Sequence, residues 1–292
     1  MTRDEIVAGA RASIEKGSKS FRAASKLFDG PTRDRAAMLY CWCRHCDDVC
    51  DGQLHGFGST ARGNVSVLRG KTRQVLAGEP VDDLPFVALK QLLHECPIPE
   101  QFIEDHLAGF ALDEIGWRPQ TEEDLILYCY HVAGAVGCMM AILMGVSPKD
   151  EQTLERAADL GIAFQLSNIA RDLREDFEAG RCYVPIDWLS EYDIDPSELL
   201  NVRHRRSLAD IVRRMVENIK IFETSARLGV KQLPFRCRLA VLAALRIYGA
   251  IGRRVGKLGS AAFDQRVTVG KTQKLAYLVP TLAEAVVVGL RH

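Results

Sequence analysis

The sequence predicts an all-α fold with many long helices, and three observations support this prediction. Apolar residues recur at spacings of three and four along most of the chain, as on one face of a helix. Proline and glycine residues separate these periodic stretches. Alternation typical of a β-strand is absent over any useful length; the nearest segment, Tyr183–Ile186, is too short.

The periodic stretches define the expected helices in chain order. They run approximately over Asp34–Asp51, Val65–Leu76, Phe86–His94, Glu100–Asp113, Glu122–Leu143, Lys149–Glu175, Ser207–Leu228, Arg236–Lys257 and Gly270–Gly289. The polar segment Gly52–Asn64 is expected to be a loop. The sequence contains no linker-like segment and no abrupt change of composition, so residues 1–292 are expected to form a single large domain.

Composition excludes several classes of protein. The 38 acidic and 38 basic residues give a net charge of zero, whereas a nucleic-acid-binding protein usually has a basic excess. The longest apolar run, Val136–Val146, is far shorter than the roughly 20 residues of a membrane span. No transmembrane helix is therefore expected, although peripheral membrane contact is compatible with the sequence.

The cysteines and the N-terminus indicate a cytoplasmic location. The first residues, Met1–Lys16, lack the apolar core of a signal peptide, and the nine cysteines favour a reducing compartment without disulfides. Cys41, Cys43, Cys46 and Cys50 match no common metal-ligand spacing and are expected to be small buried residues.

A group of polar side chains shares one face at the end of the expected helix Asp34–Asp51. At 100° per residue, one sector of about 60° holds two carboxylates, an arginine and a phenol: Asp47, Asp51, Arg44 and Tyr40. Carboxylates on an apolar helix are costly to bury without a partner. Arg44 could neutralise Asp47 or Asp48 as a purely structural ion pair, or the acids could be placed to bind a cation.

A second acidic stripe favours the cation-binding interpretation over a purely structural ion pair. Its members are four residues apart on one helix face: Asn168, Asp172 and Asp176, with Gln165 close by. Oxygen ligands without histidine suit Mg²⁺ or Mn²⁺ rather than zinc. Because Mg²⁺ usually binds one or two carboxylates together with substrate phosphates, two facing stripes would hold a diphosphate through several ions. Arg44 and Arg171 would add direct contacts with the diphosphate.

Such a site predicts ionisation of an allylic diphosphate. Metal ions and arginines make the diphosphate a better leaving group, and its departure leaves a carbocation. The cation needs a dry pocket with apolar and aromatic walls. Candidate wall residues are Phe21, Tyr40, Trp42, Tyr128, Tyr130, Phe164, Tyr183 and Tyr248, of which Tyr183 follows the second acidic stripe most closely.

The motifs resemble those of the squalene/phytoene synthase family, and the similarity extends from about Ser13 to Lys274. The resembling segments are Gly17–Phe21, Cys43–Asp51, Tyr128–Gly134, Asn168–Asp172 and Gly180–Pro185. The resemblance implies the isoprenoid synthase fold, with helices around a central cavity. It also implies that Asp47 and Asp51 form a first metal motif and that Asn168, Asp172 and Asp176 form a second.

The resemblance assigns further substrate-binding residues. The positions that match diphosphate contacts are Lys19, Ser20, Arg44, Arg171, Tyr248 and Arg266. The positions that match the cavity wall near the reacting carbons are Phe21, Tyr128, Gln165 and Tyr183, while Tyr40 is placed at the site by its shared face with Asp47. No side-chain base is assigned, and the sequence makes no prediction of oligomeric state.

The resemblance also implies a reaction. Two isoprenoid diphosphates condense head to head through a cyclopropylcarbinyl diphosphate, and the likeness to bacterial phytoene synthases favours geranylgeranyl diphosphate, without NADPH. Squalene synthases usually carry a C-terminal anchor and a reductant site, which this sequence does not show. The alternative within the family is a dehydrosqualene or presqualene diphosphate synthase that uses farnesyl diphosphate. A more remote alternative is a non-catalytic lipid-binding or assembly-factor relative.

Overall fold

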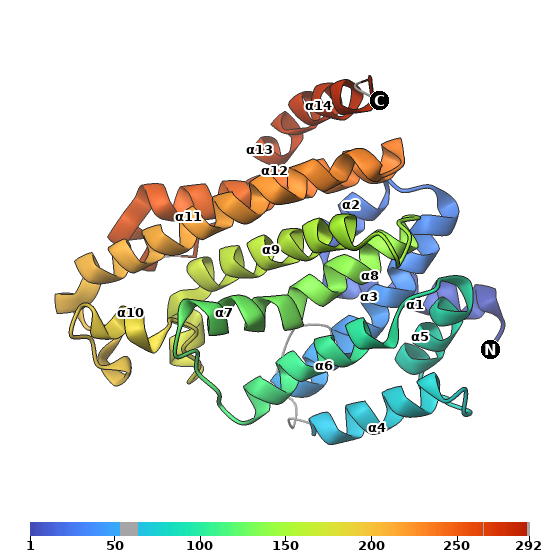
Figure 1. Ribbon diagram of the computed structural model, residues 1–292, viewed down its shortest axis with the longest axis horizontal. Helices are drawn as coiled ribbons and strands as arrows, with labels where there is room; N and C mark the ends of the chain where they lie inside the picture. Colours follow the sequence, from blue (N-terminus) through green and yellow to red (C-terminus); the bar gives the residue numbers. More distant parts are fainter. Residues whose placement is uncertain (53–63, 265, 291–292) are drawn as a thin grey trace.

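The computed structural model describes residues 1–52, 64–264 and 266–290, and this part of the chain is helical without any strand (Figure 1). The α-helices are α1 Arg3–Gly17, α2 Lys19–Ser25, α3 Gly30–Asp51, α4 Val65–Leu76, α5 Leu84–Glu95, α6 Glu100–Glu114, α7 Glu122–Cys129, α8 Ala135–Leu143, α9 Glu151–Glu178, α10 Ile186–Ser190, α11 Arg205–Gly229, α12 Phe235–Leu258, α13 Lys271–Ala276 and α14 Leu278–Leu290. The all-α prediction is thus confirmed. Residues 53–63 of the expected loop lie outside the described residues.

Sequence reasoning missed two helices near the N-terminus and the short helix α10. Helix α1 begins with a capping box, in which Thr2 and Glu5 satisfy each other's backbone N–H groups. It buries Ile6, Ala10 and Ile14 along one face. The spacing of these apolar residues is helical, so the pattern was present in the sequence. Charged residues around this narrow apolar stripe made it inconspicuous.

The expected helix Glu122–Leu143 is interrupted by a turn of π-helix, Tyr130–Gly134, which separates α7 from α8. By length and composition alone, Glu122–Leu143 is apolar enough to span a membrane, and sequence reasoning overlooked it because it counted only the unbroken apolar run. Half of its most apolar window is buried inside the protein, as in the core helix of a helical bundle. Its components pack against α6 and α9.

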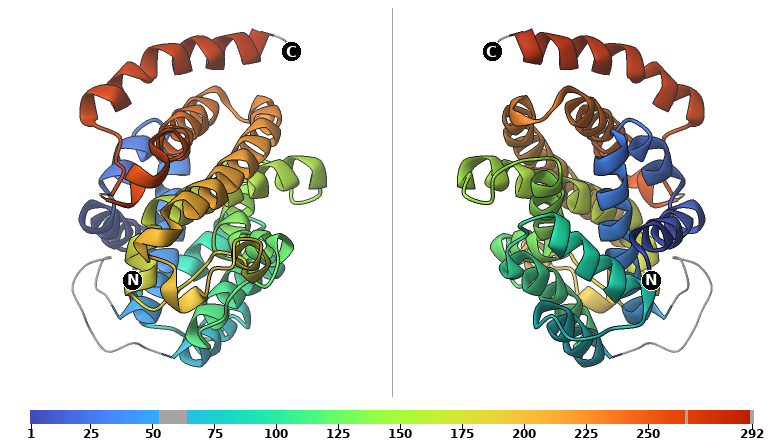
Figure 2. Two further views of the ribbon diagram at one scale, coloured as in Figure 1. Left: turned by 90° about the vertical axis from the view of Figure 1, so that its left-hand side faces the viewer. Right: turned by 90° about the vertical axis from the view of Figure 1, so that its right-hand side faces the viewer.

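The expected helix Gly270–Gly289 is likewise divided, into α13 and α14. Helix α14 lies on the outside of the bundle against α12 (Figures 1 and 2). Thr281 and Ala285 are fully buried in this contact, and Glu284 forms ion pairs with Arg227 of α11 and Arg246 of α12. The opposite face of α14 exposes aliphatic side chains, among them Val279 and Leu282.

Helix α9 occupies the middle of the bundle, between α11 and α12 on one side and α7 and α8 on the other (Figure 1). Its backbone approaches the π-helical turn so closely that a Cβ atom on Gly161 would lie 2.2 Å from the carbonyl oxygen of Ala133. Glycine is therefore required there. This close packing fixes the position of the helix that carries the second acidic stripe.

Both acidic motifs lie at the C-terminal ends of their helices, Asp51 in the last turn of α3 and Asp176 in the last turn of α9. After α9, Gly180 adopts a left-handed conformation with φ of 81° and reverses the chain. The Arg181 N–H then donates to the carbonyl of Asp176 at 2.8 Å. This reversal places the Arg181 side chain beside the acidic motif that precedes it.

Candidate active site

The first acidic motif is held by one arginine of its own helix. The Arg44 guanidinium lies 2.9 Å from Asp47 and 3.3 Å from Asp48. Protein surrounds Asp47, and burial raises the pKa of its carboxyl to about 7, against the opposing effect of Arg44. Yet 43% of the Asp47 side chain is accessible. The Asp47 carboxylate can therefore be reached by a ligand from solvent.

The second acidic motif receives more positive charge. Helix α9 is kinked at Asp172, with φ −101° and ψ 16°, and the Asp172 carboxylate accepts hydrogen bonds from two arginines. Arg171 Nε donates to it at 2.7 Å, and Arg266 donates from Nε and Nη2 at 2.7 and 3.0 Å. Burial alone would raise the pKa of Asp172, but the two guanidinium groups hold it below its usual value.

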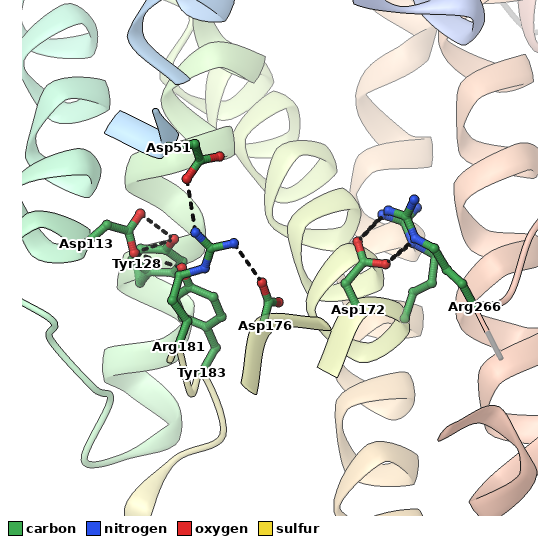
Figure 3. Close-up of polar contacts among 9 residues, drawn as sticks. Asp51, Asp113, Tyr128, Asp172, Asp176, Arg181, Tyr183 and Arg266 are labelled. Carbon is green, nitrogen blue, oxygen red and sulfur yellow. Dashed lines mark hydrogen bonds and ion pairs between the residues drawn. The ribbon is translucent and has the colours of Figure 1, made fainter. Parts of the chain in front are cut away.

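Arg181 joins the two motifs (Figure 3). Its Nη1 lies 3.0 Å from Asp51 at the end of α3, and its Nη2 lies 3.3 Å from Asp176 at the end of α9. Burial raises the pKa of Asp176 to about 6, although Arg181 opposes this shift. The ion pairs therefore establish that the two sequence-predicted acidic stripes meet in space, at the ends of helices distant in the chain.

A carboxylate that sequence reasoning did not identify lies beside them. Asp113 of α6 accepts hydrogen bonds from Tyr128, at 2.9 and 3.1 Å, and from Tyr183, at 2.8 Å. The two phenol rings stack with centroids 4.9 Å apart, and Trp117 stacks on Tyr128 at 5.7 Å. Burial raises the pKa of Asp113, against the effect of both tyrosines and of Arg181.

The remaining predicted residues are distributed around these motifs. Gln165 accepts a hydrogen bond from Asn168 at 3.4 Å, Phe21 stacks on Tyr40 at 5.0 Å, and Phe164 stacks on Tyr248 at 4.2 Å. The side chains of Lys19 and Ser20 lie outside the described residues. Trp42, considered as a wall residue, is fully buried in the core, where it packs against His106.

A cavity of about 160 Å³ lies next to the second motif. Its walls are formed by Arg171, Ile247, Tyr248, Ile251, Arg266 and Val267–Val269. Two guanidinium groups thus share this cavity with mainly apolar side chains. The volume is below the ~300–1,000 Å³ of a typical small-molecule site, so the cavity is too small for the whole of a large ligand.

Two residues of this site, Asp113 and Arg181, were missed as functional candidates. Arg181 stood inside a recognised motif, but the sequence alone did not show that it would turn back toward both acids. Asp113 ends an expected helix and is not part of a stripe of carboxylates four residues apart like those of the two motifs. A weak signal existed in Gly180, because glycine after a helix predicts a chain reversal.

Among the residues that the structure describes, no three histidine, cysteine, aspartate or glutamate side chains converge closely enough to hold a metal ion by themselves. The cysteines of α3 are free thiols, and neither Cys41 nor Cys46 is exposed. Instead, each of the four motif aspartates lies against at least one arginine, and Arg181 is shared by Asp51 and Asp176.

The fold and these motifs define a class of protein, that of the isoprenoid synthases. A solved dehydrosqualene synthase superposes with a TM-score of 0.84 at 24% identity, covering 96% of each chain. A squalene synthase from Alicyclobacillus acidocaldarius gives a TM-score of 0.78 at 20% identity, covering 88% of this chain and 95% of the other. At these identities the similarity concerns the fold, which is the one expected from the sequence.

Sequence comparison identifies the family. Residues 14–273 match the model of the squalene/phytoene synthase family. The chain is 45% identical to a 15-cis-phytoene synthase of Enterobacter agglomerans over 94% of both chains. It is 40% identical to a 15-cis-phytoene synthase of Pantoea ananas, covering 100% of this chain and 96% of the other. The chain belongs to the squalene/phytoene synthase family and is an enzyme of the prenyltransferase type.

Proposed function

We infer that this enzyme is a phytoene synthase that condenses two geranylgeranyl diphosphates head to head. The two molecules first form a cyclopropylcarbinyl diphosphate, and phytoene is then released, so that two diphosphates and a proton leave in total. The observation that carries this inference is the 40–45% identity with bacterial enzymes of that name over nearly the whole chain. The meeting of both acidic motifs through Arg181 supports it.

The family depends on divalent metal ions, and we propose that Mg²⁺ binds here to Asp47, Asp51, Asn168, Asp172 and Asp176. The fit rests on the chemistry of the site. All these donors are oxygen atoms, and four of them belong to carboxylates. Asp51 and Asp176 lie in the last turns of their helices, where the helix dipole disfavours negative charge. The raised pKa values of Asp47 and Asp176 indicate that the protein leaves them short of positive charge. Bound Mg²⁺ would neutralise the departing diphosphate.

The protein's own side chains complete the proposed mechanism. Arg171 and Arg266 face the cavity beside Asp172 and would bind diphosphate oxygens directly. Tyr248, stacked on Phe164, forms an aromatic wall of the same cavity and would stabilise the cation that the leaving diphosphate creates. Apolar neighbours such as Ile247 and Ile251 exclude water, which would otherwise capture the cation.

We also propose peripheral contact with membranes, because both the substrate tail and the product are hydrocarbons. Helix α14 supports this proposal. Its exposed face consists of aliphatic side chains, namely Leu278, Val279, Leu282, Val286 and Val287, and its one acidic residue, Glu284, is neutralised by two arginines. Co-sedimentation with liposomes should fall when Val279 and Leu282 are changed to serine; unchanged binding would exclude α14 as the contact.

Product analysis tests the proposed function. Purified protein with Mg²⁺ is incubated with geranylgeranyl or farnesyl diphosphate, each with and without NADPH, and the hydrocarbon and diphosphate products are identified by mass. We expect phytoene from the longer substrate without any reductant. A C30 product from farnesyl diphosphate alone would instead assign the enzyme to dehydrosqualene or presqualene diphosphate synthesis.

A further inference from the structure

Asp113 is a largely buried carboxylate, and each of its two oxygens lies within hydrogen-bond distance of a tyrosine hydroxyl. Tyr183 donates to Oδ1, and the Tyr128 hydroxyl lies within hydrogen-bond distance of both oxygens. Phenols that donate to a carboxylate form charge-assisted hydrogen bonds, which are stronger and more directional than neutral ones. These contacts fix the orientation of two rings that come from different parts of the chain, the end of α7 and the segment after α9.

The same carboxylate lies close to the acidic motifs. Its negative charge adds to the raised pKa of both Asp47 and Asp176, and Arg181 in turn lowers the pKa of Asp113. Figure 3 shows the Asp113–tyrosine contacts beside Arg181, the residue that links Asp51 with Asp176. Asp113 is therefore near enough to influence the groups that would hold the diphosphate, without being a member of either motif.

The location of Asp113 near the acidic motifs explains why this position has an aspartate although its burial is energetically unfavourable. Burial alone makes an aspartate unfavourable unless hydrogen bonds and nearby positive charge compensate it. A neutral asparagine has nearly the same shape, but it has only one oxygen that can accept hydrogen bonds from the phenols. An ionised group adds a fixed negative charge, which stabilises positive charge that develops nearby during a reaction.

We propose that Asp113 is a positioning residue for the ionisation of the allylic diphosphate. This proposal rests on the proposed function. It holds Tyr128 and Tyr183 in their stack next to Arg181, so that the aromatic wall and the Arg181 bridge keep one geometry while the diphosphate leaves. The fixed charge of Asp113 favours the allylic cation over the uncharged hydrocarbon chain from which it forms.

The test is a double-mutant cycle on the full chain with Mg²⁺, using whichever of geranylgeranyl and farnesyl diphosphate the wild type converts. We expect Asp113→Asn to lower kcat about 100-fold, since misplaced catalytic geometry has effects of this size. KM should change by less than about threefold, because Asp113 does not contact the substrate. Adding Asp113→Asn to Tyr183→Phe should lower kcat only about twofold further, because both changes break one unit.

Asp105 supplies a matched control. It lies on the same helix, α6, and accepts a hydrogen bond from Tyr130 at 2.8 Å, so it is also an aspartate paired with a phenol. Whatever its own effect on kcat, Asp105→Asn should multiply with Tyr183→Phe, as independent sites do. Circular dichroism checks that each variant is folded.

The outcomes separate this inference from the proposed function. A wild type that makes no phytoene contradicts the proposed function, whereas an active wild type with normal kcat in Asp113→Asn contradicts only the role of Asp113. Multiplicative effects of Asp113→Asn and Tyr183→Phe would also overturn it. If Asp113→Asn does not fold, the double variant Tyr128→Phe/Tyr183→Phe decides instead: we expect the same 100-fold loss, and a kcat near wild type would reject the proposal.

Discussion

Asp47 on α3 and Asp172 on α9 are matching acids of the two motifs, and the protein supplies them with different amounts of positive charge. Asp47 has Arg44, which also contacts Asp48, whereas Asp172 has Arg171 and Arg266. The pKa of Asp47 is accordingly raised to about 7, and that of Asp172 is lowered. Asp172 is thus largely neutralised by the protein, whereas Asp47 is left short of positive charge, and we expect Asp47 to depend more strongly on an added cation.

Although Asp47 and Asp172 differ in their charge environment, both should be equally necessary for turnover. We expect Asp47→Asn and Asp172→Asn each to lower kcat by about 1,000-fold or more, roughly 4 kcal/mol, because each removes a proposed metal ligand. Steady-state turnover with Mg²⁺ measures this loss, and circular dichroism verifies folding. A folded Asp172→Asn variant with near-normal activity would contradict the proposed metal site.

The same two variants should differ in stability when EDTA has removed divalent ions. In Asp47→Asn a carboxylate short of positive charge is replaced by a neutral amide, so the melting temperature should stay constant or rise. In Asp172→Asn two guanidinium groups lose their shared partner, which should cost about 1 kcal/mol, or roughly 2–4 °C. Calorimetry would refute the comparison if both variants shifted in the same direction.

A fully paired carboxylate outside the site gives a third point of comparison. Arg3, Gln91 and Arg35 all donate to Glu95, and these hydrogen bonds, that of Arg3 foremost, lower its pKa to about 2. A lowered pKa means that the stabilisation is present above the unfolded pKa of about 4.5 and is lost as the pH falls toward 2. Glu95→Gln should therefore cost about 0.5–1 kcal/mol at pH 7 and progressively less below pH 4.5.

Urea unfolding at several pH values measures this effect, and turnover at pH 7 should be unchanged. A stability difference that does not depend on pH would show that Glu95 acts through packing rather than through its charge. Together with the Asp47 and Asp172 variants, this result would distinguish carboxylates whose charge stabilises the folded protein from carboxylates whose charge does not.

The acidic stripes were predictable because helical periodicity alone places Asp47 and Asp51 on one helix face, and Asp172 and Asp176 on another. The proximity of Arg44 to Asp47, and of Arg171 to Asp172, was predictable for the same reason. These are local relations, fixed by 3.6 residues per turn. Most expected helices were also confirmed, since long amphipathic stretches are reliable signals.

The rest depended on contacts between distant segments. Arg266 reaches Asp172 across 94 positions, and Tyr183 reaches Asp113 across 70, so no helical periodicity connects them. Resemblance to the family suggested Arg266, but nothing suggested Asp113. The interruption of the helix at Tyr130 was equally hidden, because its residues fit an ordinary helical pattern.

That π-helical turn has a consequence for insertions and deletions. A π-turn holds one residue more than the α-turn it replaces, so removing one residue from Tyr130–Gly134 could restore a continuous α-helix with its hydrogen bonds intact. Because the removed residue is the extra one, the residues on either side, Tyr128 included, would keep nearly the same orientation. The same deletion within a regular turn of α8 would instead rotate α7, with Tyr128, by about 100° relative to the rest of α8. The π-turn is thus the place in this long helical segment where the loss of one residue would leave the aromatic wall pointing at Asp113.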